Sequence, residues 1–252
     1  MRCAEPVRHV NADGTRKHAW RKTLRRAAWI ALEPTPAHIV QWVISGSTLV
    51  VLLTMTAVLL DGRVYGWEVD LTRESQRFDY PQWAFDLTAN ELTNSDTPLG
   101  AAIILSVVGL LWFLRLRVES LMVLLISVPL HIVVNFPKAI VERERPDGAL
   151  DGTGAMKSFP SGHAEFAITF YGFLVYLALL YIRNRFIRVA LVAVWVVMVI
   201  AVGFARMEAN RHWPLDIIGG YVIGVGALSA LIWLHASLTM AIRSPGAEPH
   251  HG

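Results

Sequence analysis

The chain has 252 residues, of which 54% are hydrophobic and only 17% are charged. This low charge content and a mean hydropathy of +0.43 exclude an ordinary soluble domain of this size and predict a membrane protein. The formal net charge is +3, and the single cysteine, Cys3, excludes an intrachain disulfide and a cysteine-cluster metal site.

Residues 1–37 are rich in Arg and Lys, and we expect them to form a cytoplasmic basic tail. From Trp20 to Leu32 basic and apolar residues alternate. This pattern fits either a short interfacial helix on anionic headgroups or a solvated tail that obeys the positive-inside rule. The stretch does not have the short apolar core and small-residue cleavage site of a secretory signal peptide.

Six apolar stretches approach the length needed to cross a bilayer. They cover about residues 39–60, 98–114, 119–136, 163–182, 187–205 and 216–240. Some could instead be core helices of a soluble bundle, but six such runs joined by polar connections favour a membrane protein. We therefore expect an all-α, polytopic bundle of six transmembrane helices over residues 38–241, followed by a cytoplasmic tail at 242–252.

The distribution of charge predicts the orientation of this bundle. The connection at 61–97 is acidic, whereas the basic residues gather at the N-terminus and in the connections expected on the same side. Both termini are therefore expected in the cytoplasm, with 61–97 outside. The aromatic and apolar side chains of 78–87 suggest one or two short helices on the membrane surface, which could anchor the loop or guide lipid.

Polar clusters stand at the ends of three apolar stretches, all on the predicted outer face. In the first, Lys138 and Arg145 are seven residues apart and would share a helix face if the helix continued past Pro137. Pro146 then turns the chain away. Two cations on one face could bind an anion, although Lys and Arg are also ordinary interfacial residues.

The second cluster opens the fourth apolar stretch with Pro160, Ser161, Gly162 and His163. Ser161 is a good N-cap, and Gly162 would let an anion approach the free backbone N–H groups of the first turn. His163 could donate a proton to a group that leaves a bound phosphate. A capped helix with an incidental interfacial histidine is the alternative.

The third cluster contains Arg206, His212 and Asp216. Asp216 lies four residues after His212, so its carboxylate could accept a hydrogen bond from one ring nitrogen and leave the other ready to attack. Asp216 could also merely cap the last apolar helix, and the two roles are compatible.

The order and spacing of these clusters resemble the signature of the type 2 phosphatidic acid phosphatase superfamily, which includes membrane lipid phosphate phosphatases and vanadium haloperoxidases. The resemblance is to its membrane-integral phosphatase branch and covers the third to the sixth apolar stretch. It implies that His212 is a nucleophile that forms a phosphohistidine and that Asp216 orients it. It also implies that His163 protonates the leaving group and later activates water.

The same resemblance implies a set of ligands for the phosphoryl oxygens, namely Lys138, Arg145, Ser161, Gly162 and Arg206. It implies neither a metal nor any other cofactor, and the clusters contain no carboxylate set suited to Mg²⁺. The expected partners are a membrane lipid phosphate and the bilayer, with no nucleic acid, and the oligomeric state is left open. Ala205 departs from the family pattern, which usually has serine there, and this predicts altered affinity or substrate preference.

The leading hypothesis is a membrane lipid phosphatase of the cytoplasmic (inner) membrane whose active site faces the periplasm or exterior. It would hydrolyse a monoester or diphosphate such as phosphatidic acid, phosphatidylglycerophosphate or polyprenyl diphosphate, as a metal-independent hydrolase. The alternatives are a lipid phosphotransferase with the same site, a haloperoxidase, and a membrane protein that binds lipid without catalysis.

Overall fold

The computed structural model describes residues 36–78, 81, 83, 87, 91–93, 97–127, 136–146 and 157–243. Within these ranges the regular structure is helical, which confirms the all-α class. Both predicted tails lie almost wholly outside the described residues, as does the alternating basic stretch from Trp20 to Leu32.

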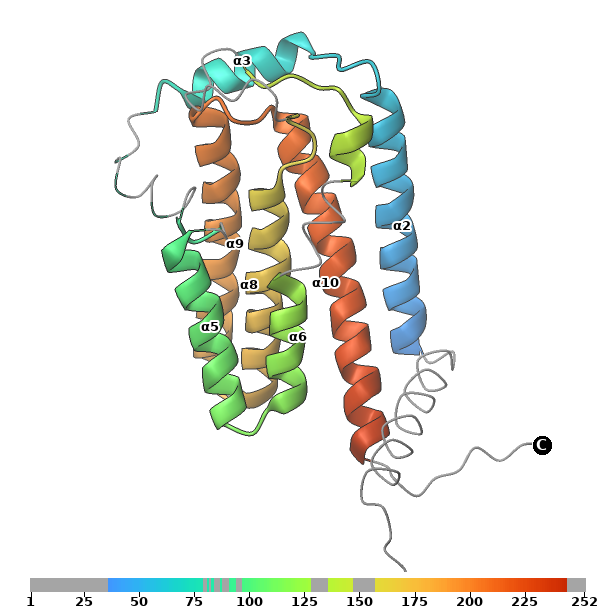
Figure 1. The fold of residues 1–252 in the computed structure, drawn as a ribbon, viewed down its shortest axis with the longest axis vertical. Helices are drawn as coiled ribbons and strands as arrows, with labels where there is room; N and C mark the ends of the chain where they lie inside the picture. Colours follow the sequence, from blue (N-terminus) through green and yellow to red (C-terminus); the bar gives the residue numbers. More distant parts are fainter. Residues whose placement is uncertain are drawn as a thin grey trace, which may run out of the picture.

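The helices form an elongated bundle with one helix across its end (Figure 1). In chain order they are α2 (Pro36–Val58), α3 (Gly66–Ser75), α5 (Pro98–Phe113), α6 (Arg117–Ser127), α8 (Gly162–Tyr181), α9 (Arg185–Glu208) and α10 (Pro214–Arg243). All except α3 run along the long axis, and α3 lies over the end where α8 and α10 begin. α8 packs against both α9 and α10, and α10 packs against α2.

Among the described residues, four helices are long and apolar enough to cross a membrane. They are His38–Val58, Gly162–Tyr181, Arg185–Glu208 and Pro214–Ile242. The second predicted span appears as α5, an apolar helix of 16 residues. The third appears in part as α6, which ends at Ser127, and residues 128–135 of that stretch lie outside the described residues. Six spans therefore remain a prediction.

The outer helices keep large apolar side chains on the surface. Val43 of α2 is 61% exposed, and Val189 and Val194 of α9 are 69% and 68% exposed. An apolar surface along helices of this length is typical of contact with lipid hydrocarbon. α8 has the opposite character, because half of its residues are buried, including Phe166, Phe170 and Phe173.

Glycines of α10 allow it to approach α8 closely. A Cβ atom at Gly220 would lie 2.3 Å from the carbonyl oxygen of Ser161, and one at Gly224 would lie 2.8 Å from the Cβ of Ile168. Small residues at helix contacts let backbones come together in this way. The beginning of α10 is therefore held against the beginning of α8.

The predicted continuous helix through Lys138 and Arg145 is wrong. A short helix covers residues 136–140 and is closed by the bond from the amide of Val141 to the carbonyl oxygen of Pro137, and residues 141–146 are not helical. In this segment burial alternates, since Val141 and Arg143 are buried whereas Glu142 and Glu144 are exposed. Alternation with a period of two is typical of extended chain.

The segment 61–97, which is predicted to lie outside and is named the outer segment for that reason, contains a short helix, as predicted, but the helix precedes the aromatic stretch. It is α3, and Glu68 forms a capping box at its start with Tyr65. Most of 79–90 lies outside the described residues. The ring of Phe78 meets that of Phe204 in α9 edge to face, with centroids 5.6 Å apart, so the segment packs onto the end of the bundle.

Candidate active site

The three polar clusters converge at the end of the bundle that α3 covers. The backbone amide of Ser161 donates a 2.9 Å hydrogen bond to the carbonyl oxygen of Asp216, which joins the first turns of α8 and α10. Arg206 reaches the same place from the last turn of α9.

Ser161 caps α8 as predicted. Its Oγ accepts a hydrogen bond from the amide of Ala164 at 3.5 Å, and its backbone is extended. Gly162 and His163 follow in the first turn, and both are partly exposed. The charges of Arg206, Lys138 and Arg145 all act on His163, as does its neighbour His212. The predicted proton donor therefore lies among the predicted cations.

His212 is buried, with 2% of its surface exposed. Its Nδ1 lies 2.9 Å from the carbonyl oxygen of Ser158. A carbonyl can only accept, so Nδ1 carries the proton and Nε2 keeps its lone pair in the neutral ring. Burial lowers the pKa of His212 well below its ordinary value, and the positive charges of Arg206, Lys138 and Arg145 lower it further. The ring is therefore neutral near pH 7, with Nε2 available as a nucleophile.

Asp216 stands next to His212 but is not its nearest hydrogen-bond partner. Asp216 Oδ2 is 3.7 Å from His212 Nδ1 and accepts a 2.8 Å hydrogen bond from the amide of Trp213. Asp216 Oδ1 accepts from Arg143 at 2.7 Å. In this geometry the carbonyl of Ser158 orients the imidazole ring directly, and Asp216 acts on it as a nearby negative charge.

Lys138, Arg145 and Arg206 surround the two histidines. Burial lowers the pKa of Lys138 to about 8, and the charges of Arg145 and Arg206 act in the same direction. Lys138 and Arg145 are thus close in space, as predicted, although an extended segment and not a helix face brings them together. Three cations around a neutral histidine form a site suited to a phosphate group.

Sequence reasoning missed three residues of this site: Glu68, Arg143 and Ser158. Arg143 is wholly buried between the carboxylates of Glu68 and Asp216. The sequence did contain a signal for Arg143. Val141, Arg143 and Arg145 alternate with the acids Glu142 and Glu144, and this period of two predicts an extended chain with both arginines on one side. No local pattern indicated Glu68, which is 75 residues away from Arg143.

Among the described residues, no group of three His, Cys, Asp or Glu side chains is arranged to hold a metal ion. Ala205, at the position where the family pattern has serine, is fully buried in the last turns of α9. Its side chain offers no hydroxyl beside Arg206.

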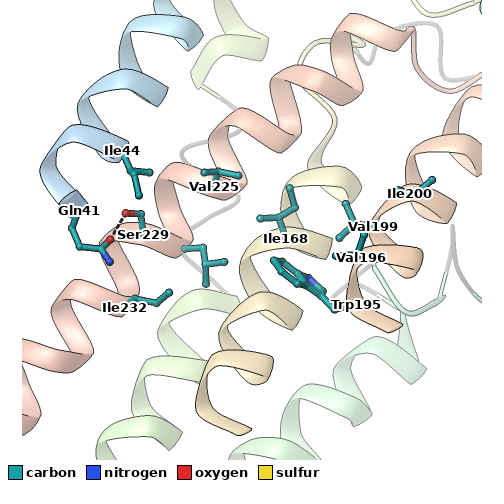
Figure 2. A pocket seen from close by; sticks show the side chains of 11 residues that line it. Gln41, Ile44, Ile168, Trp195, Val196, Val199, Ile200, Val225, Ser229 and Ile232 are labelled. Carbon is teal, nitrogen blue, oxygen red and sulfur yellow. Dashed lines mark hydrogen bonds between the residues drawn. The ribbon is translucent and has the colours of Figure 1, made fainter. Parts of the chain in front are cut away.

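An apolar cavity of about 350 Å³ lies between α2, α8, α9 and α10 (Figure 2). Its walls include Ile168, Trp195, Val199 and Val225. At one end Ser229 donates a hydrogen bond to Gln41. Val199 precedes Arg206 by seven residues on α9. It therefore lies about 10 Å along the helix axis from Arg206, one of the three residues (Lys138, Arg145 and Arg206) that form the cationic cluster. This volume is within the range of small-molecule sites, and the pocket is open to the outside of the bundle, where its lining residue Ile200 is 64% exposed.

The part of the chain that contains these clusters is similar to known proteins. Residues 117–240 match the PAP2 superfamily. Over 127 residues the chain is 29% identical to a lipid A 1-phosphatase of Rhizobium etli. This alignment covers 46% of this chain and 50% of the relative. Over 143 residues it is 27% identical to phosphatidylglycerophosphatase B of Bacillus subtilis, covering 54% of this chain and 70% of the relative.

A solved structure has the same fold. It is that of a transmembrane PAP2 type phosphatidylglycerolphosphate phosphatase from Bacillus subtilis, with a TM-score of 0.62 and 19% identity over 75% of this chain and 94% of the other. The alignment with the Rhizobium etli relative spans about half of that protein's length. The matched region, 117–240, contains all three polar clusters in the order of the family signature, and this region of the chain belongs to the PAP2 superfamily.

Proposed function

We propose that this protein is a membrane lipid phosphatase that hydrolyses a lipid phosphate monoester or diphosphate through a phosphohistidine at His212. The observation that carries the proposal is the buried His212 with its Nδ1 2.9 Å from a backbone carbonyl and three cations around it. A histidine that served only to bind phosphate would do so as a charged donor, whereas this one is held neutral. The names of the relatives support the same class of reaction.

In the proposed first step, His212 Nε2 attacks phosphorus and the bond from phosphorus to the leaving oxygen breaks. His163 gives a proton to that oxygen, which leaves as an alcohol or, from a diphosphate, as a phosphate. In the second step water attacks phosphorus, His163 takes its proton, and the P–N bond breaks. The products are inorganic phosphate and neutral His212.

The cations supply electrostatic stabilisation in both steps. Lys138, Arg145 and Arg206 would hold the three non-bridging oxygens, whose charge increases toward the transition state. The hydroxyl of Ser161 and the backbone N–H of Gly162 at the start of α8 would add donors at the positive end of the helix dipole. Because these groups already provide positive charge, we propose that no metal is required.

We propose that the apolar cavity of Figure 2 holds a hydrocarbon chain of the substrate. It extends along the helices that carry His163, Arg206 and Asp216, so a lipid with its phosphate in the site would place its chain alongside. This geometry favours a lipid over a soluble phosphate ester. Phosphatidic acid, phosphatidylglycerophosphate, polyprenyl diphosphate and lipid A 1-phosphate are the substrates to compare.

The test is release of inorganic phosphate by the purified protein in detergent with excess EDTA, across that panel of lipids. We expect release from at least one lipid, and loss of at least about 10³-fold in kcat for His212→Gln. Wild-type release that disappears with EDTA and returns with Mg²⁺ would contradict metal independence. Undiminished release by a folded His212→Gln variant would contradict the phosphohistidine.

Added alcohols would separate hydrolysis from phosphotransfer, since a transferase would form a new phosphate ester.

We also propose six spans between residues 38 and 241, with the tails at 1–37 and 242–252 in the cytoplasm and the active site on the outer face of the inner membrane. Cys3 is the only cysteine, so a Cys3→Ser background allows single-cysteine labelling. Arg77→Cys should react with a membrane-impermeant maleimide in spheroplasts, whereas Arg183→Cys should react only after permeabilisation. The reverse pattern would contradict the orientation.

A further inference from the structure

Arg143 is a buried cation that the phosphate-binding signature does not include. Its side chain is 0% exposed. Nη1 donates to Asp216 Oδ1 at 2.7 Å, Nη2 donates to Glu68 Oε2, and Nε donates to the carbonyl oxygen of Arg63 at 3.2 Å. The guanidinium therefore joins the outer segment, through Arg63 and Glu68, to the carboxylate beside His212.

The backbone of Arg143 reaches His212 by a second route. Its carbonyl oxygen accepts hydrogen bonds from the amide of Ser158 at 2.9 Å and from Ser158 Oγ at 3.1 Å. The carbonyl of Ser158 in turn accepts from His212 Nδ1 at 2.9 Å. Both neighbours of the imidazole, Ser158 and Asp216, are thus held by the same arginine.

Glu68 stands at the other end of this series of hydrogen bonds. The side chain is buried, Oε1 accepts from the amide of Leu215 at 3.1 Å, and Oε2 accepts from the amide of Tyr65 at 3.1 Å. Leu215 directly precedes Asp216, so Glu68 holds the first turn of α10 as well as Arg143. Its two oxygens tie the start of α3 to the start of α10.

The chain before α3 is shaped to make these contacts. Gly62 has φ +70, a conformation that favours glycine, and a Cβ there would lie 2.9 Å from the carbonyl oxygen of Glu142. This close approach brings Arg63 within hydrogen-bond distance of Arg143. The outer segment and the segment 141–146 are therefore in backbone contact.

On the basis of the proposed function, we propose that Arg143 and Glu68 are positioning residues for the nucleophile His212, and that the start of the outer segment, from Gly62 to Glu68, holds the catalytic centre in place. Neither side chain touches the phosphate site directly. A buried ion pair of this kind contributes little net stability, because desolvation offsets the attraction, whereas well-packed apolar side chains would fill the same space. Its fixed, multiply bonded geometry is suited to holding Asp216 and Ser158 on either side of the ring.

The test is the kinetics of Glu68→Gln, Arg143→Gln and the double variant with a lipid phosphate that the wild type accepts. We expect kcat to fall about 100-fold in Arg143→Gln and about tenfold in Glu68→Gln, which keeps its volume and one oxygen for Leu215. KM should stay within about threefold, because Lys138, Arg145 and Arg206 remain. The double variant should resemble Arg143→Gln alone, since two residues that act through one chain of contacts are not additive.

The matched control is the exposed pair of Arg77 and Glu74 in the same segment, 2.7 Å apart. Arg77→Gln and Glu74→Gln should leave kcat and KM unchanged. Arg143→Lys, which keeps the charge but cannot bridge two carboxylates, should recover part of the lost kcat. If Arg143→Gln does not accumulate as folded protein, Glu68→Gln with its kcat-specific loss still decides the question.

The proposal is overturned if a folded Arg143→Gln or Glu68→Gln variant has wild-type kcat, if the losses fall on KM, or if they multiply in the double variant. These outcomes require a wild type that releases phosphate. A wild type that releases none from any lipid would instead overturn the proposed function itself, so the two failures are distinguishable.

Discussion

The backbone amide of Ser161 donates a hydrogen bond of 2.9 Å to the carbonyl oxygen of Asp216. This bond joins the residue that caps α8 to the first turn of α10. His163 lies two residues after Ser161, and Asp216 lies beside His212. The separation of the proposed acid from the proposed nucleophile therefore depends on how closely these two helix ends approach.

Gly220→Ala tests this dependence. The added Cβ would lie 2.3 Å from the carbonyl oxygen of Ser161, a backbone atom that cannot move without shifting α8 or α10. We expect the free energy of unfolding to fall by about 1–3 kcal/mol and kcat to fall at least about tenfold. Thermal unfolding in detergent and phosphate release measure the two effects.

Gly46→Ala in α2 is the control, because no atom of the described residues outside the surrounding turns of α2 lies within 4 Å of its added Cβ. Alanine there should be neutral or slightly stabilising, since it replaces glycine inside a helix. Equal behaviour of the two variants would show that the α8–α10 approach is not constrained.

The pKa of Lys138, lowered to about 8 by burial and then by Arg145 and Arg206, predicts an alkaline limit of activity. Below pH 8 Lys138 is a cation that can bind phosphate, and above it the free enzyme loses this charge. The value of kcat/KM, which reports the free enzyme, should therefore fall as pH rises through about 8. Lys138→Arg keeps its charge and should move this limb to higher pH. An unchanged limb in Lys138→Arg would assign it to another group.

A larger side chain in the cavity should raise KM for long-chain lipid phosphates and leave KM for short-chain phosphate esters unchanged. Val199→Phe places a larger ring between α8, α9 and α10, and we expect KM for a long-chain lipid phosphate to rise about tenfold. A water-soluble short-chain phosphate should be hydrolysed as by the wild type. Val197→Phe is the matched control, because Val197 is on the same helix, is 65% exposed and does not line the cavity. Equal effects on both substrates would mean that bulk lipid, and not the substrate chain, occupies the cavity.

Ala205→Ser restores the hydroxyl of the family pattern beside Arg206. Ala205 is fully buried, so the added oxygen must find a partner in the site or remain unsatisfied. We expect KM to change about threefold to tenfold for at least one lipid phosphate, which corresponds to one hydrogen bond. Ala201→Ser, one turn earlier on α9, should leave KM unchanged. If both variants match the wild type with every lipid, Ala205 has no bearing on substrate binding.

The apolar stretches predicted most of the fold because the hydrophobic signal is local and repeats over many residues. The fourth to sixth stretches became α8, α9 and α10 with ends close to those expected, and Ser161 predicted the start of α8 correctly. The same reasoning failed at 141–146, where a helical period was assumed from Lys138 and Arg145. Burial there alternates with a period of two, and those few residues carry a weak signal.

The charged residues and the proposed catalytic residues of the signature could be found from their spacing, but the residues that hold them in place could not. In the sequence alone, Arg143 resembles any other interfacial charge. Its pairing with Glu68 exists only because the outer segment folds over the end of the bundle. Likewise, the carbonyl of Ser158 has no signature in the sequence, because a backbone group is independent of residue type.

The apolar pocket and the site residues His163, Arg206 and Asp216 occupy different turns of the same three helices, α8, α9 and α10. Substitutions a few turns from the cluster can reshape the cavity without touching a residue that meets phosphate. If the pocket holds the substrate chain as proposed, related chains can diverge in the lipid they select while retaining one reaction chemistry, and the residues that record this divergence lie outside the signature.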